Sequence, residues 1–209
     1  MSLDNILLGL LRQPASGYDV KRVLDEGIGH FWAAELSQIY PALKRLEKRR
    51  WLRARKVDSK RGPGKYVYQT TTAGHAALRD WLEASPQLGD ERFAYLAQLY
   101  FMDELADANK TLRFLLRLRE SVGRKLESLQ QTENRWARED SRYPDHLPAF
   151  DFHVHLTLRI GLLTLAAKLK WCDESIRRVR ARAAQAEKRR RPSTSRIGPM
   201  KRRSQASGT

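Results

Sequence analysis

Positively charged side chains gather in one short part of the sequence. Between Lys44 and Lys65 the chain carries eleven lysines and arginines and only two acids, Glu47 and Asp58. Cations at this density neutralise the phosphates of a nucleic acid, and phosphate contacts supply a large share of protein–DNA affinity. A charge run is more often only the solvated face of a helix. The shortage of acids in this run favours the nucleic-acid interpretation.

The run begins inside the stretch SQIYPALKRLEKRRW, which has the pattern of an amphipathic helix. Ile39, Leu43 and Leu46 recur at i, i+4 and i+7 and predict a helix over Ser37–Arg49 with one narrow apolar face. Ser37 is expected to cap this helix, with the proline inside its first turn. The residues expected to face DNA from this helix are Ser37, Gln38, Tyr40, Pro41, Lys44, Arg45 and Lys48.

These side chains suit different parts of a DNA duplex. Ser37, Gln38 and Arg45 can hydrogen-bond base edges or nearby phosphates. Tyr40 is expected to pack on the sugar-phosphate backbone. The lysines, together with the arginines that follow them, are expected to neutralise phosphates.

A β-hairpin is predicted directly after this helix. WLRARKV alternates apolar and basic residues, and KYVYQTT is rich in aromatic and β-branched residues. Between them, DSKRGPGK contains a Gly-Pro-Gly turn, so the hairpin has a basic tip at residues 60–65. The hairpin residues expected to contact the minor groove or the backbone are Lys60, Arg61, Gly62, Lys65 and Tyr66.

Short helices are expected before the basic region. Leu3–Arg12 is an apolar segment closed by Pro14. Ser16 is a suitable N-cap for a second helix, which is expected to end at Gly27 and Gly29. These helices and the basic one have the spacing of a helix-turn-helix unit.

A further helix, predicted over Thr72–Glu83, is expected to pack Leu78, Trp81 and Leu82. Three helices and a basic hairpin predict a winged helix-turn-helix domain over residues 1–86. The fold class is therefore mainly α: a winged helix-turn-helix, made of three helices plus a β-hairpin wing, followed by an α-helical dimerisation domain.

Residues 87–187 are expected to be helical. ERFAYLAQLYFMDEL predicts an apolar helix, a second helix has an apolar stripe of helical period, and a third is predicted over Phe150–Glu187. The third helix is apolar on most sides from Phe152 to Trp171, and the two long helices have more apolar surface than they can cover for each other. A homodimer is therefore expected. The residues assigned to the dimer are Leu118, Val122, Trp136, Phe152, Leu156, Leu163 and Trp171.

The last segment, residues 188–209, has eight basic residues and no acid. A segment of this composition is expected to be disordered. It has two interpretations. As a nonspecific DNA arm it would add affinity through counterion release and local concentration; otherwise it is an inert solvated end.

The composition of the whole chain limits the class of protein. A net charge of +16 favours a polyanionic partner, with nucleic acid ahead of an anionic membrane surface. The sequence has no apolar run that could span a bilayer and no secretory signal, so a cytoplasmic protein is expected. Cys172 stands alone, which excludes an intrachain disulfide and a cysteine-based zinc site.

Enzyme chemistry, a cofactor and a metal are not expected. The GPGK stretch lacks the Ser or Thr that follows a P-loop lysine, because Lys65 precedes Tyr66. His153 and His155 are two residues apart, so on a helix they point to different sides and cannot share a metal ion. On a strand they could share one, but the flanking pattern predicts a helix.

The order of these motifs resembles the PadR family of bacterial transcription regulators. A Gly-Tyr pair of the family matches Gly17–Tyr18, and its Ser-x-hydrophobe-Tyr-Pro-x-Leu motif matches Ser37–Leu43. Its Gly/Pro wing with a following Thr-x-x-Gly matches Gly62–Gly74. Arg50 occupies a place where the family usually has glycine, between the basic helix and the first wing strand.

The resemblance extends to the C-terminal part. LRIGLLTLAAKLKW is similar to the last helix of the longer, virulence-activator-like PadR domain, with Gly161 and Trp171 at the expected places. The resemblance implies a dimer formed by C-terminal helices. Some members of the family bind a planar aromatic or phenolic effector between those helices, so the resemblance makes Trp136 and Trp171 candidates for such a site. Packing of the two tryptophans in the dimer core is the favoured interpretation, and the effector site is the alternative. A basic tail is not a usual feature of the family.

Together these patterns predict a homodimeric, sequence-specific transcriptional regulator, interpreted as a repressor. The helix Ser37–Arg49 is expected in the major groove of a roughly palindromic operator, with the 60–65 wing on the flanking backbone. The alternative is a low-specificity nucleoid-associated or architectural DNA-binding protein, in which charge and tail dominate. A winged helix that serves only protein interaction is disfavoured by the acid-poor wing.

Overall fold

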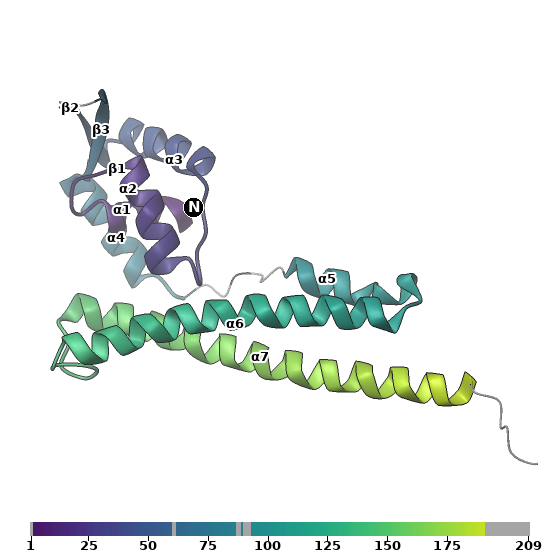
Figure 1. Ribbon diagram of the computed structural model, residues 1–209. Helices are drawn as coiled ribbons and strands as arrows, with labels where there is room; N and C mark the ends of the chain where they lie inside the picture. Colours follow the sequence, from purple (N-terminus) through teal and green to yellow (C-terminus); the bar gives the residue numbers. More distant parts are fainter. Residues whose placement is uncertain (1, 60–61, 87–88, 90–92, 191–209) are drawn as a thin grey trace, which may run out of the picture. The chain divides into compact units, whose positions relative to one another are not determined.

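The computed structural model describes residues 2–59, 62–86, 89 and 93–190 (Figure 1). The chain divides into two compact units, Met1–Arg92 and Phe93–Thr209. The first combines helices with a three-stranded sheet, and the second consists of helices and their connections. The predicted fold class, a winged helix-turn-helix followed by a helical domain, is confirmed.

The core of the first unit lies between helices. These are α1 (Ser2–Leu10), α2 (Gly17–Val23), α3 (Leu36–Lys48) and α4 (Thr72–Glu83), and a single π-helical turn, Leu24–Ile28, continues α2. Burying one large apolar side chain contributes about 1.5–3 kcal/mol to the free energy of unfolding, so the side chains buried between these helices stabilise the unit. The fully buried side chains here include Leu7, Leu8, Leu11, Val20, Leu24, Ile39, Leu43 and Leu46.

The predicted wing is confirmed as a hairpin of β2 (Leu52–Ser59) and β3 (Gly62–Thr70), which pair antiparallel. Sequence patterns did not predict β1 (Ala15–Ser16), which pairs with the other edge of β3 and makes the strand order β1-β3-β2. At the base of the hairpin, Thr70 Oγ1 donates to the carbonyl of Leu8 at 2.8 Å. The wing is therefore fastened to the helical core from two directions.

Ser16 is confirmed as the N-cap of α2. Its Oγ accepts a hydrogen bond from the Asp19 N–H at 3.2 Å, and Asp19 Oδ2 accepts one from the Ser16 N–H at 3.1 Å. This is a capping box, in which two otherwise unpaired N–H groups are satisfied. Because Ser16 also ends β1, one residue both closes the sheet and starts the helix.

The predicted start of α3 is wrong by two positions. The N-cap is Glu35, not Ser37, and the Gln38 side chain accepts a hydrogen bond from the Glu35 N–H at 3.0 Å, which stabilises the earlier start. Pro41 consequently lies inside the helix rather than in its first turn. Since proline has no N–H, the carbonyl of Ser37 lacks its usual intrahelical donor.

The turn from α3 into β2 has a left-handed residue, Arg50, with φ of 59°. The Arg50 N–H donates to the Glu47 carbonyl at 2.8 Å, and the Trp51 N–H donates to the Leu46 carbonyl at 3.0 Å. This pair of hydrogen bonds is a Schellman motif, whose left-handed position is usually glycine because an L-residue is strained there. Arg50 therefore stores backbone strain at the junction between the basic helix and the wing.

The start of α4 explains the Thr-x-x-Gly motif. Thr71 Oγ1 caps the helix by accepting from the Gly74 N–H at 3.1 Å, and it donates to the Arg50 carbonyl at 2.8 Å. A Cβ on Gly74 would lie 2.2 Å from the Trp51 carbonyl oxygen, which no side chain tolerates. The motif thus fixes α4 against the same turn that ends α3.

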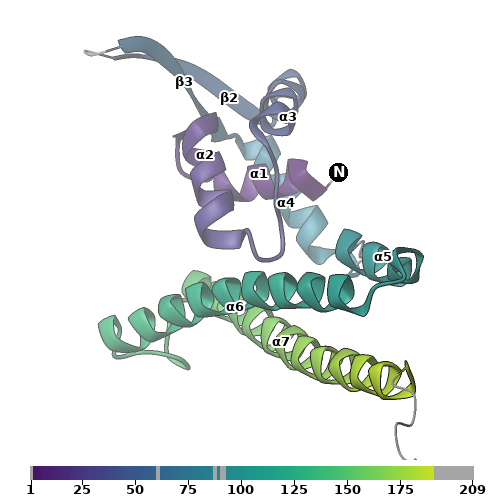
Figure 2. The same ribbon diagram turned by 45° about the vertical axis from the view of Figure 1, so that its right-hand side comes forward.

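The second unit is built on a long antiparallel helical hairpin of α6 (Ala108–Glu139) and α7 (Ala149–Arg190) (Figure 2). It is preceded by α5 (Ala94–Tyr100) and a 3₁₀ turn, Met102–Leu105. Two ion pairs join α6 and α7: Arg159 Nη1 with Glu133 Oε1 at 2.7 Å, toward the connection between the helices, and Arg119 Nε with Asp173 Oδ1 at 2.5 Å, farther from it. Apolar residues between the two helices include Leu126, Leu129, Leu158, Leu162, Leu165 and Leu169.

Three predicted features of the helices are corrected. The apolar helix expected to continue to Leu105 ends at Tyr100, where a 3₁₀ turn replaces it. The last helix continues through Arg190, so Lys188 and the two residues after it are helical rather than disordered; the rest of the basic tail lies outside the described residues. On α4, Leu78 is buried as expected, but Trp81 and Leu82 are exposed.

Candidate nucleic-acid interface

One face of α3 points away from the core of the first unit and is exposed. Ile39, Ala42, Leu43 and Leu46 are buried, and the helical period places Ser37, Pro41, Lys44 and Lys48 on the opposite side at i, i+4, i+7 and i+11. All four are exposed, and among the described residues neither lysine makes an ion pair. We call these four residues the outer face of α3. It has the chemistry of a surface that meets phosphates and base edges.

Tyr40 lies on one flank of α3 rather than on the outer face. Its ring packs against α2 so closely that a Cβ on Gly17 would lie 2.8 Å from Tyr40 Cε1. The side chain keeps 43% of its surface exposed. The glycine of the Gly-Tyr pair therefore makes room for the tyrosine of the basic helix, a relation that the sequence alone did not predict.

Arg45 lies on the other flank and is held by an acid that sequence reasoning missed. Its Nε donates to Asp4 Oδ2 at 3.1 Å, and its Nη2 donates to Asp4 Oδ1. Arg49 Nη1 lies 3.9 Å from Asp4 Oδ2. The hydrogen bond from Arg45 to Asp4 raises the pKa of the guanidinium above its ordinary value. Both arginines remain about half exposed, so the outer face is bordered by two fixed cations.

Gln38 is partly committed to the fold. Its side-chain oxygen accepts the hydrogen bond from Glu35 that defines the start of α3. An amide has two donors besides this acceptor, and these remain for other partners. The predicted role of Gln38 at a base edge thus rests on its NH2 group alone.

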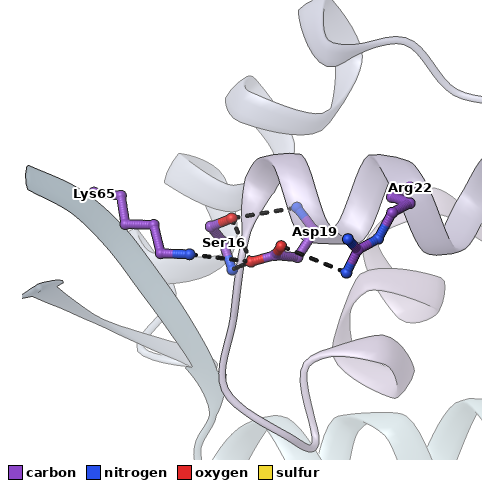
Figure 3. A network of polar contacts seen from close by, with 4 residues as sticks. All are labelled: Ser16, Asp19, Arg22 and Lys65. Atoms are coloured by element: carbon purple, nitrogen blue, oxygen red, sulfur yellow. Dashed lines mark hydrogen bonds and ion pairs between the residues drawn. The ribbon is translucent and has the colours of Figure 1, made fainter. Parts of the chain in front are cut away.

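The wing carries a second polar network (Figure 3). Lys65 reaches from β3 toward α2, where its Nζ lies 3.6 Å from Asp19 Oδ2, and Arg22 Nη2 lies 3.8 Å from Asp19 Oδ1. Hydrogen bonds from the Ser16 side chain and backbone, more than Lys65 and Arg22, hold the pKa of the Asp19 carboxyl below its ordinary 3.8. One carboxylate therefore joins the wing to the cap of α2.

The other wing residues predicted to contact DNA are only partly described. Lys60 and Arg61 lie outside the described residues, and Gly62 begins β3. Tyr66 is exposed on β3, next to Lys65. Arg55 and Lys56 of β2 are also exposed, so the described part of the hairpin presents cations on both strands.

Comparison with known proteins agrees with this geometry. Residues 6–80 match the model of the transcriptional regulator PadR-like family, and residues 91–180 match that of the virulence activator alpha C-terminal domain. The negative transcriptional regulator PadR of Bacillus subtilis is 30% identical over 177 residues, which cover 82% of this chain and 93% of the relative. The chain belongs to the PadR family of transcriptional regulators.

Solved structures of the PadR family extend the comparison over most of the chain. Bacillus subtilis PadR in complex with operator DNA aligns with a TM-score of 0.70 at 26% identity and covers 86% of this chain and 99% of that one. The same protein in complex with p-coumaric acid aligns at 0.63 and 26%, covering 85% and 94%. The Vibrio cholerae virulence activator AphA aligns with a TM-score of 0.65 at 25% identity and covers 86% of this chain and 98% of that one.

The C-terminal unit of this PadR-family chain divides its predicted dimer residues into two groups. Val122 is buried against the chain's own hairpin, and Leu118, Trp136 and Trp171 are partly buried. The exposed group lies along α7: Phe152, Leu156 and Leu163, with Ile160 between them. Of the two groups, the second has the larger exposed surface for contact with another chain.

The two tryptophans do not form one site within this PadR-family chain. The ion pairs Arg119–Asp173 and Glu133–Arg159 are fourteen residues apart on each helix, or ~20 Å at 1.5 Å per residue. Trp136 lies close to the second pair and Trp171 close to the first. A small aromatic molecule can therefore contact one of them in a protomer, but not both.

The structure adds two observations on other chemistry. Among the described residues, no three His, Cys, Asp or Glu side chains are grouped so that they could hold a metal ion. No helix in the described part of the chain has the length and apolarity needed to cross a membrane.

Proposed function

We propose that this PadR-family regulator is a repressor that binds a roughly palindromic operator as a homodimer. The observation that carries the proposal is the outer face of α3, whose Ser37, Pro41, Lys44 and Lys48 are exposed opposite a fully buried apolar face. In a helix-turn-helix such a face enters the major groove. The wing, through Lys65 and Tyr66 and the tip at Lys60–Gly62, meets the flanking backbone. The complex of Bacillus subtilis PadR with operator DNA supports this assignment.

The homodimer is proposed from α7. Phe152, Leu156, Ile160 and Leu163 form a stripe at helical spacing, with between about a third and three fifths of each side chain exposed. Apolar stripes of this length are covered by a partner in stable proteins, and a second copy offers the same surface under two-fold symmetry. Two copies of α3 would then read half-sites whose centres are ~34–36 Å apart, one helical turn of DNA.

The domain roles follow from this assignment. Residues 1–86 bind DNA, residues 87–187 dimerise, and the basic residues 188–209 add nonspecific affinity for DNA, all in the cytoplasm. Repression is the simplest outcome of a dimer that occupies an operator, and the Bacillus subtilis relative is named a negative regulator. The Vibrio cholerae relative is named an activator, so a reporter assay with and without the protein tests the sign of regulation.

A small aromatic effector is proposed for the C-terminal unit. The complex of Bacillus subtilis PadR with p-coumaric acid supports a ligand of this class. Trp136 and Trp171 are both partly buried, so a ligand that binds beside either one should quench its fluorescence. Titration of Trp136→Phe and Trp171→Phe variants with phenolic acids identifies which tryptophan reports binding. A lack of saturable quenching in the wild-type protein removes the effector from the proposal.

The test of the main proposal is selection of bound DNA from a random pool by the full chain, followed by competition against bulk genomic DNA. A symmetric motif and a specificity ratio of at least ~10³ are expected of a regulator. A preference below that ratio, without a symmetric motif, identifies the chain as a low-specificity architectural protein instead. Light scattering of the free protein and of the complex then measures whether two copies bind one operator.

A further inference from the structure

A buried acid from α1 stands directly beside the proposed DNA-binding surface. The Asp4 side chain is only 7% exposed, although it lies in the first turn of α1. Both of its oxygens are used by α3: Oδ1 accepts from Arg45 Nη2, and Oδ2 accepts from Arg45 Nε at 3.1 Å and lies 3.9 Å from Arg49 Nη1. One carboxylate therefore holds two arginines that are one helical turn apart.

The arginines are held by one edge and open at the other. Arg45 and Arg49 keep 47% and 44% of their side-chain surface exposed. A guanidinium has five N–H donors, and Arg45 gives two of them to Asp4, so three remain. Arg49 is supported a second time, because its guanidinium carbon lies 5.2 Å from the centre of the Trp51 ring. The open edges belong to side chains whose positions are already fixed.

Their place on α3 indicates which part of DNA they meet. Arg45 and Arg49 lie on the flank of the helix that faces α1, beside the outer face formed by Ser37, Pro41, Lys44 and Lys48. When the outer face enters a groove, a flank faces the sugar-phosphate wall of that groove. In Arg45, the edge formed by Nε and Nη2 is occupied by Asp4, which leaves the edge formed by Nη1 and Nη2 for a phosphate oxygen.

We propose that Asp4 is a positioning residue for DNA binding, which presents Arg45 and Arg49 to phosphates at the wall of the groove. The proposal rests on DNA binding by α3 and adds an acid to the binding machinery. A free arginine loses side-chain entropy when it is immobilised on a phosphate, whereas these two are ordered before DNA arrives. Two cations on one carboxylate still leave one net positive charge, so the cluster attracts the backbone.

The positioning role and simple electrostatics predict opposite effects. If charge alone mattered, removing an acid beside a polyanion-binding surface would strengthen DNA binding. We expect Asp4→Asn to weaken it about fivefold, because the two arginines lose their fixed geometry. Glu47→Gln is the matched control: Glu47 is exposed on the same helix, and among the described residues no ion pair involves it. This variant should bind DNA as tightly as the wild type, or more tightly.

The experiment measures dissociation constants of the full chain for its selected operator and for random duplex DNA, at several salt concentrations. Asp4→Asn should raise both constants by the same factor and flatten the salt dependence, since phosphates carry no sequence information. Thermal unfolding of each variant gives the temperature range in which the variant is folded, and DNA binding is measured within that range. Asp4→Glu should recover part of the affinity.

A double-mutant cycle separates positioning from a merely structural role. In the Arg45→Ala/Arg49→Ala background, Asp4→Asn should no longer weaken binding, because the side chains that it positions are absent. The inference is overturned if Asp4→Asn binds DNA as tightly as the wild type, or if its weakening persists in the double-alanine background. Loss of sequence preference at a single base in Arg45→Ala would also overturn it, since that result identifies a base reader. If the wild-type chain binds no DNA, the proposed function itself fails.

Discussion

The two units of the chain have buried apolar cores of very different size. In the first unit, Leu7, Leu43 and Leu46 are fully buried within the unit itself. In the second, Ile160 and Leu163 on α7 are each 58% exposed. A unit that covers its own apolar surface is stable alone, whereas one that leaves a stripe exposed gains stability when a partner covers it. The contrast supports the proposal that the first unit reads DNA and that the second forms the dimer.

The largest effect is expected in the second unit. Ile160→Asp places a charge in the middle of the exposed stripe, twice per dimer, and removes two apolar contacts worth about 1.5–3 kcal/mol each. The dimer dissociation constant should rise at least ~100-fold, as measured by analytical ultracentrifugation. Gln130→Asp, at an exposed polar position of α6, should leave it unchanged. A dimer that survives Ile160→Asp would show that the stripe is not the interface.

A core substitution in the first unit should act without changing association. Leu43→Ala removes a fully buried side chain of α3 and should lower the free energy of unfolding by about 2–5 kcal/mol. Urea unfolding followed by circular dichroism measures this change, and sedimentation should still show a dimer. Leu82→Ala, at an exposed leucine of the same unit, should change stability by less than about 0.5 kcal/mol. Dissociation of the Leu43→Ala protein would contradict the independence of the two units.

A smaller effect, of opposite sign, is expected at Arg50. Its left-handed backbone is strained for an arginine, so Arg50→Gly should stabilise the first unit by about 0.5–1 kcal/mol after the greater freedom of glycine in the unfolded chain is included. Lys48→Gly is the control, since Lys48 is the last residue of α3 and makes no ion pair among the described residues, and it should destabilise by a similar amount. Thermal unfolding of both variants measures the two changes in stability. Equal destabilisation by the two glycines would mean that the turn is not strained.

The smallest effect concerns the network between the wing and α2. The pKa of Asp19 is lowered in the folded chain, chiefly by the hydrogen bond from the Ser16 side chain, with Lys65 and Arg22 adding to it. The ionised group therefore contributes stability above its ordinary pKa of 3.8, and that contribution is lost as the pH falls through the lower folded value. The stability difference between wild type and Asp19→Asn should accordingly shrink from pH 6 toward about pH 3. A difference that does not change over this range would exclude the carboxylate as its source.

Local patterns predicted the parts of this molecule that depend on neighbouring residues. The spacing of Ile39, Leu43 and Leu46 predicted the buried side of α3, the Gly-Pro-Gly turn predicted the hairpin, and Ser16 was recognised as a cap. The start of α3 was placed two residues too late because Ser37 is a common cap residue, whereas Glu35 caps through its pairing with Gln38. That error also moved Pro41 into the wrong turn.

Contacts between distant residues were not predicted, because no local signal carries them. Asp4 and Arg45 are 41 positions apart, and an acid near the start of a first helix has no feature that marks its partner. The pairing of β1 with β3 involves only two residues of β1, too few to show a period. The separation of Trp136 from Trp171 follows from the antiparallel register of α6 and α7, which neither helix specifies alone.

The sequence by itself determined the family, the order of helices and wing, and the strong positive charge of the surface that follows Ser37. These features depend on residue type and on short-range spacing, both of which can be recognised without knowledge of any long-range contact. Only the tertiary structure decided which of those cations are committed: it tied Arg45 and Arg49 to Asp4 and Lys65 to Asp19, and left Lys44 and Lys48 on the outer face. The reason is physical. A charged side chain interacts strongly only with groups within a few ångströms. Residues far apart in the sequence come that close only when the chain folds.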